Sequence, residues 1–200
     1  MKRPSSYSKE FNRCVAFHGH VCPGLALGFR AARVLMERLG VRRAADEELV
    51  AIVENDACGT DAIQVMTGCT FGKGNFIFRQ HGKQAFILVA RKRTMALRVC
   101  VRPDVLRPDP DHLSLSDKVQ NGTASPEEEG RFRQLQQGRT QKILNMASES
   151  LFKIEEVSND IPPAARVIRS GTCDICGEPT KIDLLREIDG RNLCIPCSQG

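Results

Sequence analysis

Four cysteines near the C-terminus form two C-x-x-C pairs, which constrain what the segment around them can fold into. The first pair is Cys173 and Cys176, the second is Cys194 and Cys197, and seventeen residues separate them. Each pair presents two thiolates from one tight turn, and two such turns complete a tetrahedral sulfur site for Zn²⁺. A redox dithiol pair and a chance cluster are the alternatives. We interpret the tetrad as a structural zinc site whose metal supplies folding free energy that so small a core lacks.

A hairpin signal lies between the two pairs. Asp189-Gly190 is a two-residue turn of the kind that joins antiparallel strands, and residues 181–187 and 191–194 flank it. The tail is therefore expected to be a zinc ribbon or a shortened treble clef at residues 165–200. Ile161-Pro162-Pro163 indicates its boundary with a larger domain at residues 1–155.

The composition predicts a soluble, cytoplasmic protein. Hydrophobic residues make up 41% of the chain, but no apolar run approaches the length that spans a bilayer. The first six residues lack the apolar region of a secretory signal, and nine cysteines without export are expected to be reduced thiols. The net charge of +5 permits binding to nucleic acid or to acidic partners without requiring it. A single Tyr and no Trp give base stacking little support.

Hydrophobic periodicity predicts an α+β fold for the larger domain. Helices are expected at residues 7–17, 25–39 and 60–66, and strands at residues 49–53, 75–79, 85–91 and 95–101. Because the strands are bunched late in this order, a mixed helix and sheet core is favoured over a doubly wound parallel sheet.

The residues that follow predict a loop and then a polar connecting helix. Several prolines between residues 103 and 125 indicate a loop with little regular structure. Ser125 as N-cap and Pro126 at the first helical position predict a helix from there to about Phe152, interrupted at Gly138. Its apolar positions are sparse, which is typical of a helix that connects domains or packs against a partner molecule. We therefore predict a homodimer.

Two of the four histidines and one cysteine fall within five residues. In an extended conformation His18, His20 and Cys22 would point to the same side, since side chains alternate along a strand. Pro23 opens the next helix, so Cys22 lies at a helix N-terminus, where backbone N–H groups and the helix dipole stabilise a thiolate. Such a low-pKa cysteine beside two imidazoles is a metal ligand or a nucleophile with a base. The plainer alternative is a buried cysteine next to a capping histidine.

A second cysteine repeats this arrangement. Cys58 follows a predicted strand and precedes a predicted helix, and rigid strand-to-helix turns often carry sites. The carboxylates of Asp56 and Asp61 lie nearby as supporting partners. The candidate metal ligands of the core are therefore His18, His20, Cys22 and Cys58, the two cysteines being also the candidate catalytic residues. Four protein ligands would make a site for Zn²⁺ or another transition metal, and three with an open position would make a catalytic one; both interpretations stay open.

A third segment, residues 67–75, is rich in glycine around Cys69 and Lys73. Its glycines suggest a backbone nest around an anion. It is not a Walker A loop, because Thr67 stands where a glycine is needed and Gly74 where a serine or threonine is needed. A tight turn that brings Cys69 near the other cysteines is favoured over a phosphate site at Lys73.

These three segments together resemble the FmdE family, a component of molybdenum or tungsten formylmethanofuran dehydrogenase. The resemblance rests on residues 17–24 with Gly28-Phe29-Arg30, on residues 58–64 and on residues 67–75. It extends from about residue 8 to residue 155, and many members of this family add a C-terminal zinc-finger module. It implies an α+β core whose His and Cys residues surround a cavity, often with a metal, and a tendency to dimerise. On this chain the implied lining is His18, His20, Cys22 and Cys58, with Cys69 and Lys73 nearby.

The resemblance implies an accessory protein rather than a complete catalyst. The family's enzyme oxidises formylmethanofuran to CO₂ with a molybdopterin that a different component holds, and no cysteine spacing here fits a ferredoxin pattern. We therefore predict a metal-binding accessory protein of one-carbon or molybdoenzyme metabolism. Its candidate partners are the subunits of molybdenum or tungsten enzymes.

Two other function classes stay open. In an independent enzyme, Cys22 or Cys58 would be a thiolate nucleophile, a histidine would be its base, and Lys73 would hold a small anionic substrate. In a regulator, the core would sense a metal or cofactor, and the zinc module would contact nucleic acid or protein.

Overall fold

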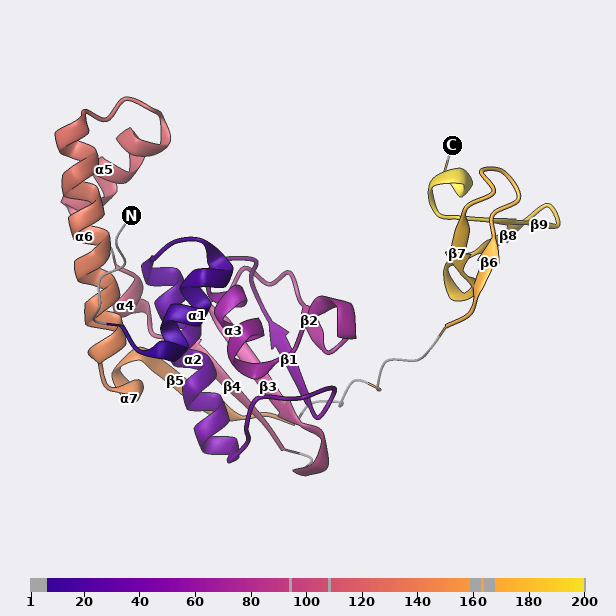
Figure 1. Ribbon diagram of the computed structural model, residues 1–200, viewed down its shortest axis with the longest axis horizontal. Coiled ribbons are helices and arrows are strands. Elements are labelled where there is room, and N and C mark those ends of the chain that lie inside the picture. The colour runs from indigo at the N-terminus through magenta and orange to yellow at the C-terminus, as the bar shows by residue number, and fades with distance from the viewer. Residues whose placement is uncertain (1–6, 94, 108, 159–162, 164–167, 200) are drawn as a thin grey trace. The chain divides into compact units, whose positions relative to one another are not determined.

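The computed structural model describes residues 7–93, 95–107, 109–158, 163 and 168–199. It divides into two compact units, Met1–Ala164 and Ala165–Gly200, and the second is drawn in yellow and light orange in Figure 1. Ile161 and Pro162 of the predicted boundary lie outside the described residues. No helix in the described part of the chain is long and apolar enough to cross a membrane.

A five-stranded sheet forms the centre of the first unit, with strand order β2-β1-β3-β4-β5. The β1–β2 pair is parallel, and the other three pairs are antiparallel. The strands are β1 (Leu49–Val53), β2 (Phe76–Phe78), β3 (Ala85–Ala90), β4 (Met95–Val101) and β5 (Phe152–Glu156).

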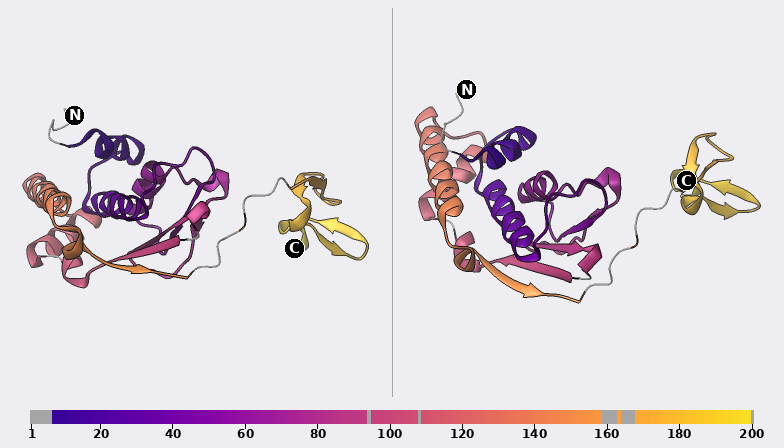
Figure 2. Two further views of the ribbon diagram at one scale, coloured as in Figure 1. Left: turned by 90° about the horizontal axis from the view of Figure 1, so that it is seen from below. Right: turned by 60° about the horizontal axis from the view of Figure 1, so that its bottom comes forward.

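Three helices cover one face of this sheet, as Figure 2 shows. They are α1 (Lys9–His18), α2 (Pro23–Leu39) and α3 (Gly59–Thr67). Ala51 and Val53 of β1 join the core beneath these helices, while Val50 and Ile52 join a smaller cluster on the opposite face. Because β1 is buried on both faces, it reads as a continuous apolar run. The mixed layers confirm the predicted α+β class.

Helix α2 is the central helix of this layer. Cys22 caps its N-terminus, Pro23 occupies its first position, and Gly40 ends it in the left-handed conformation at φ 59°. Arg30 links α2 to the later helices, because its guanidinium donates to the carbonyls of Ile143, Leu144 and Met146 at 2.6–2.9 Å. These carbonyls lie at the C-terminal end of a helix, where they lack intrahelical partners.

The loop predicted at residues 103–125 is wrong in two places. The chain forms α4 (Pro103–Leu106) and α5 (Pro110–Gln120) there. Pro103 and Pro110 each stand in the first turn of their helix, where a missing N–H costs nothing, and the Asp109 side chain caps α5. The prolines therefore start helices rather than break them.

The connecting helix is shorter than predicted. It forms α6 (Pro126–Asn145), with a capping box between Ser125 and Glu128, and it continues through Gly138 without interruption. A short helix α7 (Ser148–Leu151) follows, and then β5. The connecting helix was predicted to extend to about Phe152, which is instead the first residue of β5. Strand β5 forms because it pairs with β4 along the edge of the sheet.

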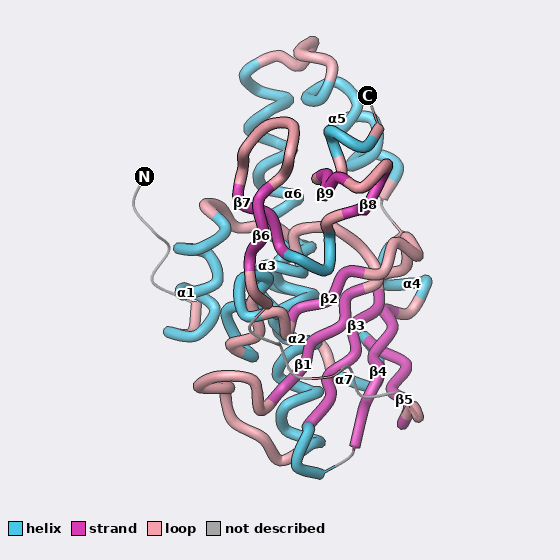
Figure 3. The backbone as a smooth tube through the Cα atoms, turned by 90° about the vertical axis from the view of Figure 1, so that its right-hand side faces the viewer, coloured by secondary structure: helices cyan, strands magenta, loops and turns pink. Residues whose placement is uncertain are grey.

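The C-terminal unit contains two small antiparallel sheets, β6–β7 and β8–β9, whose strands are magenta in Figure 3. The predicted hairpin turn is confirmed: it joins β8 to β9, with Asp189 at φ 52° and Gly190 at φ 73°. The strands are β6 (Ser170–Thr172), β7 (Pro179–Lys181), β8 (Arg186–Ile188) and β9 (Arg191–Leu193). Short 3₁₀ turns occur along the two units at Phe71–Lys73, Arg91–Arg93, Ile182–Leu184 and Pro196–Ser198.

Candidate metal sites

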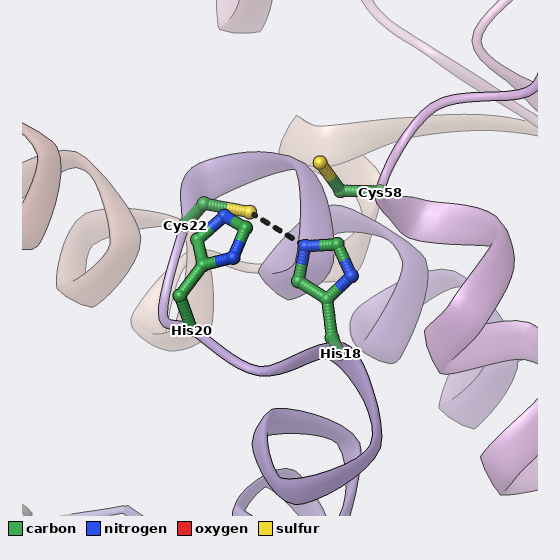
Figure 4. Close-up of side chains that lie close together, drawn as sticks. All are labelled: His18, His20, Cys22 and Cys58. Atoms are coloured by element: carbon green, nitrogen blue, oxygen red, sulfur yellow. Dashed lines mark hydrogen bonds between the residues drawn. The ribbon is translucent and has the colours of Figure 1, made fainter.

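Four side chains of the first unit bring their metal-binding atoms together, and Figure 4 shows them. One donor atom from each of His18, His20, Cys22 and Cys58 lies within 4.8 Å of the others. The Nε2 atom of His18 is 3.8 Å from the Sγ atom of Cys22. Tetrahedral zinc with ordinary Zn–N and Zn–S bonds separates its ligand atoms by roughly 3.3–3.8 Å. The cluster, here named the core donor group, is therefore close to the dimensions of a tetrahedral metal site.

The core donor group is assembled by helix ends rather than by an extended strand. His18 is the last residue of α1, and Gly19 reverses the chain at φ 96°. Cys22 and Cys58 are the residues before α2 and α3, respectively. The prediction that an extended segment places His18, His20 and Cys22 on one side is thus wrong. Helix α1 extends to His18, and the turn at Gly19 is what places His20 and Cys22 near His18.

A carboxylate fixes the orientation of His18. The Oδ2 atom of Asp61 lies 2.7 Å from Nδ1 of His18. Because an ionised carboxylate only accepts, Nδ1 carries the proton and Nε2 presents a lone pair towards Cys22. This is the arrangement in which an outer carboxylate orients a histidine ligand. Asp56, the other carboxylate that the sequence suggested, is exposed.

A close approach of α2 and α3 sets the distance between the two cysteines. A Cβ atom on Gly28 would lie 2.1 Å from the carbonyl oxygen of Gly59. Gly24 makes a similar contact, since its Cβ would lie 3.3 Å from the Cβ of Cys58. Sequence reasoning gave these glycines no role; the only signal was their position in the segments that carry the family resemblance.

Asn55 holds the turn that leads to Cys58. Its side chain is buried, donates to the carbonyl of Lys83 at 2.7 Å and accepts from the N–H of Ala57 at 3.1 Å. Sequence reasoning missed this role, although a buried amide directly after a strand is a recognisable turn signal.

Burial reverses the pKa shift that the helix N-terminus predicts for Cys22. The N–H of Leu25 donates to Sγ of Cys22 at 3.3 Å, which favours the thiolate. Burial outweighs this bond and raises the pKa of the Cys22 thiol to about 11. Partial burial of its ring, with the neighbouring His18 second, lowers the pKa of His20. Without a metal, burial therefore favours the neutral form of the Cys22 thiol.

Cys69 and Lys73 occupy other surroundings. Cys69 is fully buried in the apolar core and lies outside the core donor group. Lys73 donates from its Nζ atom to the carbonyl of Asp46 at 3.0 Å, so the fold already engages the cation of the less favoured anion site. The glycines around them end helical turns instead: Gly68 ends α3 and Gly74 ends the 3₁₀ turn before β2.

The second donor group is the C-terminal cysteine tetrad. The four sulfur atoms of Cys173, Cys176, Cys194 and Cys197 lie within 4.8 Å of one another. The Sγ atoms of Cys176 and Cys194 are 3.9 Å apart, close to the roughly 3.8 Å edge of a zinc–sulfur tetrahedron. Hydrogen bonds from backbone N–H groups lower the pKa of Cys173 to about 6, and the N–H of Cys176 has the largest effect. The tetrad thus has the ligand separations of a thiolate metal site, and the backbone stabilises the charge of Cys173. The side-chain hydrogen bond with Cys194 raises the pKa of Cys197 to about 12, so the ligands differ in how readily they ionise without a metal.

The fold and the two groups define a class: an α+β protein with a His₂Cys₂ group in one unit and a Cys₄ group in the other. A family model described as FmdE, molybdenum formylmethanofuran dehydrogenase operon, matches residues 17–153. The chain belongs to this FmdE family.

Two further comparisons place the chain among known proteins. It is 34% identical over 193 residues to a probable S-adenosyl-L-methionine-binding protein of Archaeoglobus fulgidus, an alignment that covers 93% of this chain and 51% of the relative. The chain therefore spans about half the length of that relative. It is also similar to the crystal structure of a tungsten formylmethanofuran dehydrogenase FmdE-like protein from Syntrophus aciditrophicus, with TM-score 0.60, 21% identity and coverage of 98% and 95% of the two chains. At this identity the second likeness establishes the fold alone.

Proposed function

We propose that this FmdE-family protein is a metal-binding accessory protein with two sites. The core donor group holds one transition-metal ion, Zn²⁺ being the ion that best suits two imidazoles and two thiolates, and the tetrad holds a structural Zn²⁺. The observation that carries the proposal is the convergence of four donor atoms within 4.8 Å at each group. When bound, an ion with an open coordination position supplies Lewis-acid polarisation of a ligand.

The chain's own residues favour a metal site over a free nucleophile in the core. Asp61 directs the lone pair of His18 towards Cys22, and Cys58 approaches from a different helix. A free nucleophile would need one base beside one thiol, whereas here four ligand-type side chains converge. The exposure of His20 leaves the group accessible from solvent, which suits exchange of metal or contact with a partner.

Metal content tests the proposal directly. We expect the Cys22→Ser/Cys58→Ser variant, purified without added metal, to contain one metal ion per chain where the wild type contains two, since each four-donor group holds one. Plasma mass spectrometry against protein concentration gives the ratio. Cys100→Ser is the control, because this half-buried thiol lies outside both groups. One ion in both the wild type and the double variant would confine metal to the tetrad and overturn the core site.

The Asp61 carboxylate gives a finer prediction. Asp61→Asn removes the charge that orients His18, so we expect the affinity of the core group for Zn²⁺ to fall about 10–100-fold. Competition with a chromophoric chelator measures that affinity. Asp56→Asn is the matched control, because Asp56 is an exposed carboxylate in the loop that precedes α3. Equal losses in the two variants would indicate a general effect of charge rather than orientation of His18.

The accessory role concerns partners and location. The family's description associates it with the molybdenum formylmethanofuran dehydrogenase operon, so the components of that enzyme are the first partners to test, by co-purification from cells that express both. We also propose a cytoplasmic homodimer. A sedimentation mass that stays monomeric at all concentrations would exclude the dimer.

One second candidate follows from the Archaeoglobus relative. Its description as a probable S-adenosyl-L-methionine-binding protein, at 34% identity over most of this chain, makes that compound a candidate ligand here. Equilibrium dialysis of the metal-loaded protein with labelled S-adenosyl-L-methionine tests it, and absence of retention at millimolar protein would exclude it.

A further inference from the structure

A cavity separate from both donor groups lies among α4, α5 and α6. Its volume is about 570 Å³, within the range of small-molecule sites. Apolar side chains line part of it, and basic, acidic and neutral polar side chains line the rest. The lining residues that matter here are Val105, His112, Leu135, Arg139, Lys142 and Ile143.

Two positive charges on α6 face this cavity without a negative partner. Arg139 and Lys142 are three residues apart, so they lie side by side on the helix, where like charges repel. Within the described part of the chain neither forms an ion pair with a carboxylate, and Arg139 contacts the imidazole of His112, at 3.4 Å.

The carboxylates in the lining are already engaged. Asp104 pairs with Arg107 at 3.6 Å, and the side chain of Asp109 accepts the N–H of Asp111 to cap α5. The charged lining residues are three basic and two acidic side chains, a formal net charge of +1, and neither carboxylate pairs with Arg139 or Lys142 among the described residues.

His112 holds the guanidinium of Arg139 in place. It is 8% exposed, and its ring packs against Phe132 at 5.2 Å between centroids. Because a guanidinium only donates, Nδ1 of His112 accepts from Arg139 and the proton lies on Nε2. The buried Nε2 atom of His112 forms no hydrogen bond of ordinary geometry among the described residues, and the side chain of Gln136 is the polar group that interacts with this ring.

A glycine of α6 lines the cavity. Gly138 lies inside α6, where glycine weakens a helix, and it lines the cavity. A Cβ atom there would meet no atom within 4 Å, so no close approach of another element requires the glycine. Gly130 of the same helix has equally open surroundings but does not line the cavity.

We propose that this cavity binds a small organic anion with an apolar body. Its carboxylate, phosphate or sulfonate group would lie between Arg139 and Lys142, and its apolar part would contact Val105, Leu135 and Ile143. A second copy of the chain is the rival occupant, but it would bury two cations that pair with no carboxylate among the described residues, which is unfavourable. The proposal is independent of the two metal sites.

Two fluorescent probes of nearly equal size test it on the whole chain. 8-Anilinonaphthalene-1-sulfonate carries the anionic group, and N-phenyl-1-naphthylamine lacks it. We expect the sulfonate to bind about tenfold more tightly, because a charge-assisted hydrogen bond to Arg139 or Lys142 contributes about that factor. Arg139→Gln/Lys142→Gln is expected to remove this preference. Arg13→Gln/Arg42→Gln removes equal charge from a different surface hollow and is expected to preserve it.

The glycine variants locate the binding. Gly138→Leu places a side chain in the cavity and is expected to weaken sulfonate binding about tenfold or more, whereas Gly130→Leu leaves it unchanged. Equal affinity for the two probes, or binding that Gly138→Leu leaves intact, overturns the proposal. So does a dimer that Gly138→Leu dissociates while neither probe binds, because the second copy would then be the occupant.

Discussion

Replacement of Cys194 by serine in the whole chain is expected to unfold the C-terminal unit while the α+β core stays folded. Among the described residues, the apolar core of that unit consists of Cys173, Leu193 and Cys194, with Cys197 packed against it. Burial of a leucine contributes about 1.5–3 kcal/mol, while ordering each backbone residue costs about 1–2 kcal/mol. So small a core cannot hold its strands, and we expect bound metal to supply about 10–16 kcal/mol.

Hydrogen exchange measured by mass spectrometry distinguishes the two units. We expect amides of residues 170–199 to lose protection in Cys194→Ser, amides of the central sheet to keep it, and one metal ion to be lost per chain. Cys100→Ser is the control, since it makes the same chemical change outside both donor groups. Full protection of residues 170–199 in a metal-free Cys194→Ser protein would contradict a metal-dependent fold. Treatment of the wild type with a strong chelator is expected to reproduce the loss of protection.

Elements with local signals were predictable from sequence. The apolar run of β1 predicted its bounds to the residue, and the bounds predicted for β4 also agree with the structure. Residues 103–125 failed because proline has two opposite meanings: it breaks a helix from inside and starts one from its first turn. In α5, the signal that Pro110 starts a helix is the N-cap residue Asp109 directly before it. The first buried residue of α5, His112, follows this cap by three positions.

Non-local contacts account for the remaining differences. The β5 segment has no strong strand pattern of its own and forms by pairing with β4, some fifty residues earlier in the chain. Arg30 was noticed only as part of a motif; its role as the donor to the end of α6 depends on residues more than a hundred positions away. Single-sequence reasoning contains no information on such pairs.

In the core donor group, too, the identity of the residues was predictable from local signals, whereas properties that depend on non-local packing were not. Residue chemistry and spacing selected His18, His20, Cys22 and Cys58, and the structure places their donor atoms together. The chemistry of Cys22 was not predictable in the same way, because its pKa depends on how deeply the thiol is buried, which the helix N-terminus alone does not determine. Cys69 was indistinguishable from a site cysteine until its burial in the core was known.

Gly28→Ala is expected to damage both the core and its donor group. The added Cβ would lie 2.1 Å from the carbonyl oxygen, 2.5 Å from the Cα and 2.6 Å from the carbonyl carbon of Gly59. All three are backbone atoms, so no side chain can rotate away and α3 must shift. We expect the free energy of unfolding to fall by about 3 kcal/mol, at the upper end for overpacked cores. Because Cys58 precedes Gly59, the shift also moves its sulfur away from Cys22 and is expected to release the core metal.

Gly130→Ala separates this effect from helix propensity. It makes the same substitution inside a helix, but its Cβ would meet nothing within 4 Å, so alanine is expected to stabilise the protein by up to about 1 kcal/mol. Urea unfolding followed by far-UV circular dichroism gives both free energies, and metal content gives the state of the core group. Opposite signs for the two variants, with metal lost only in Gly28→Ala, would mean that the contact between α2 and α3 holds Cys22 and Cys58 at binding distance. A Gly28→Ala protein that keeps wild-type stability and both metals would show that α3 can move without consequence, and the donor group would then need another explanation for its geometry.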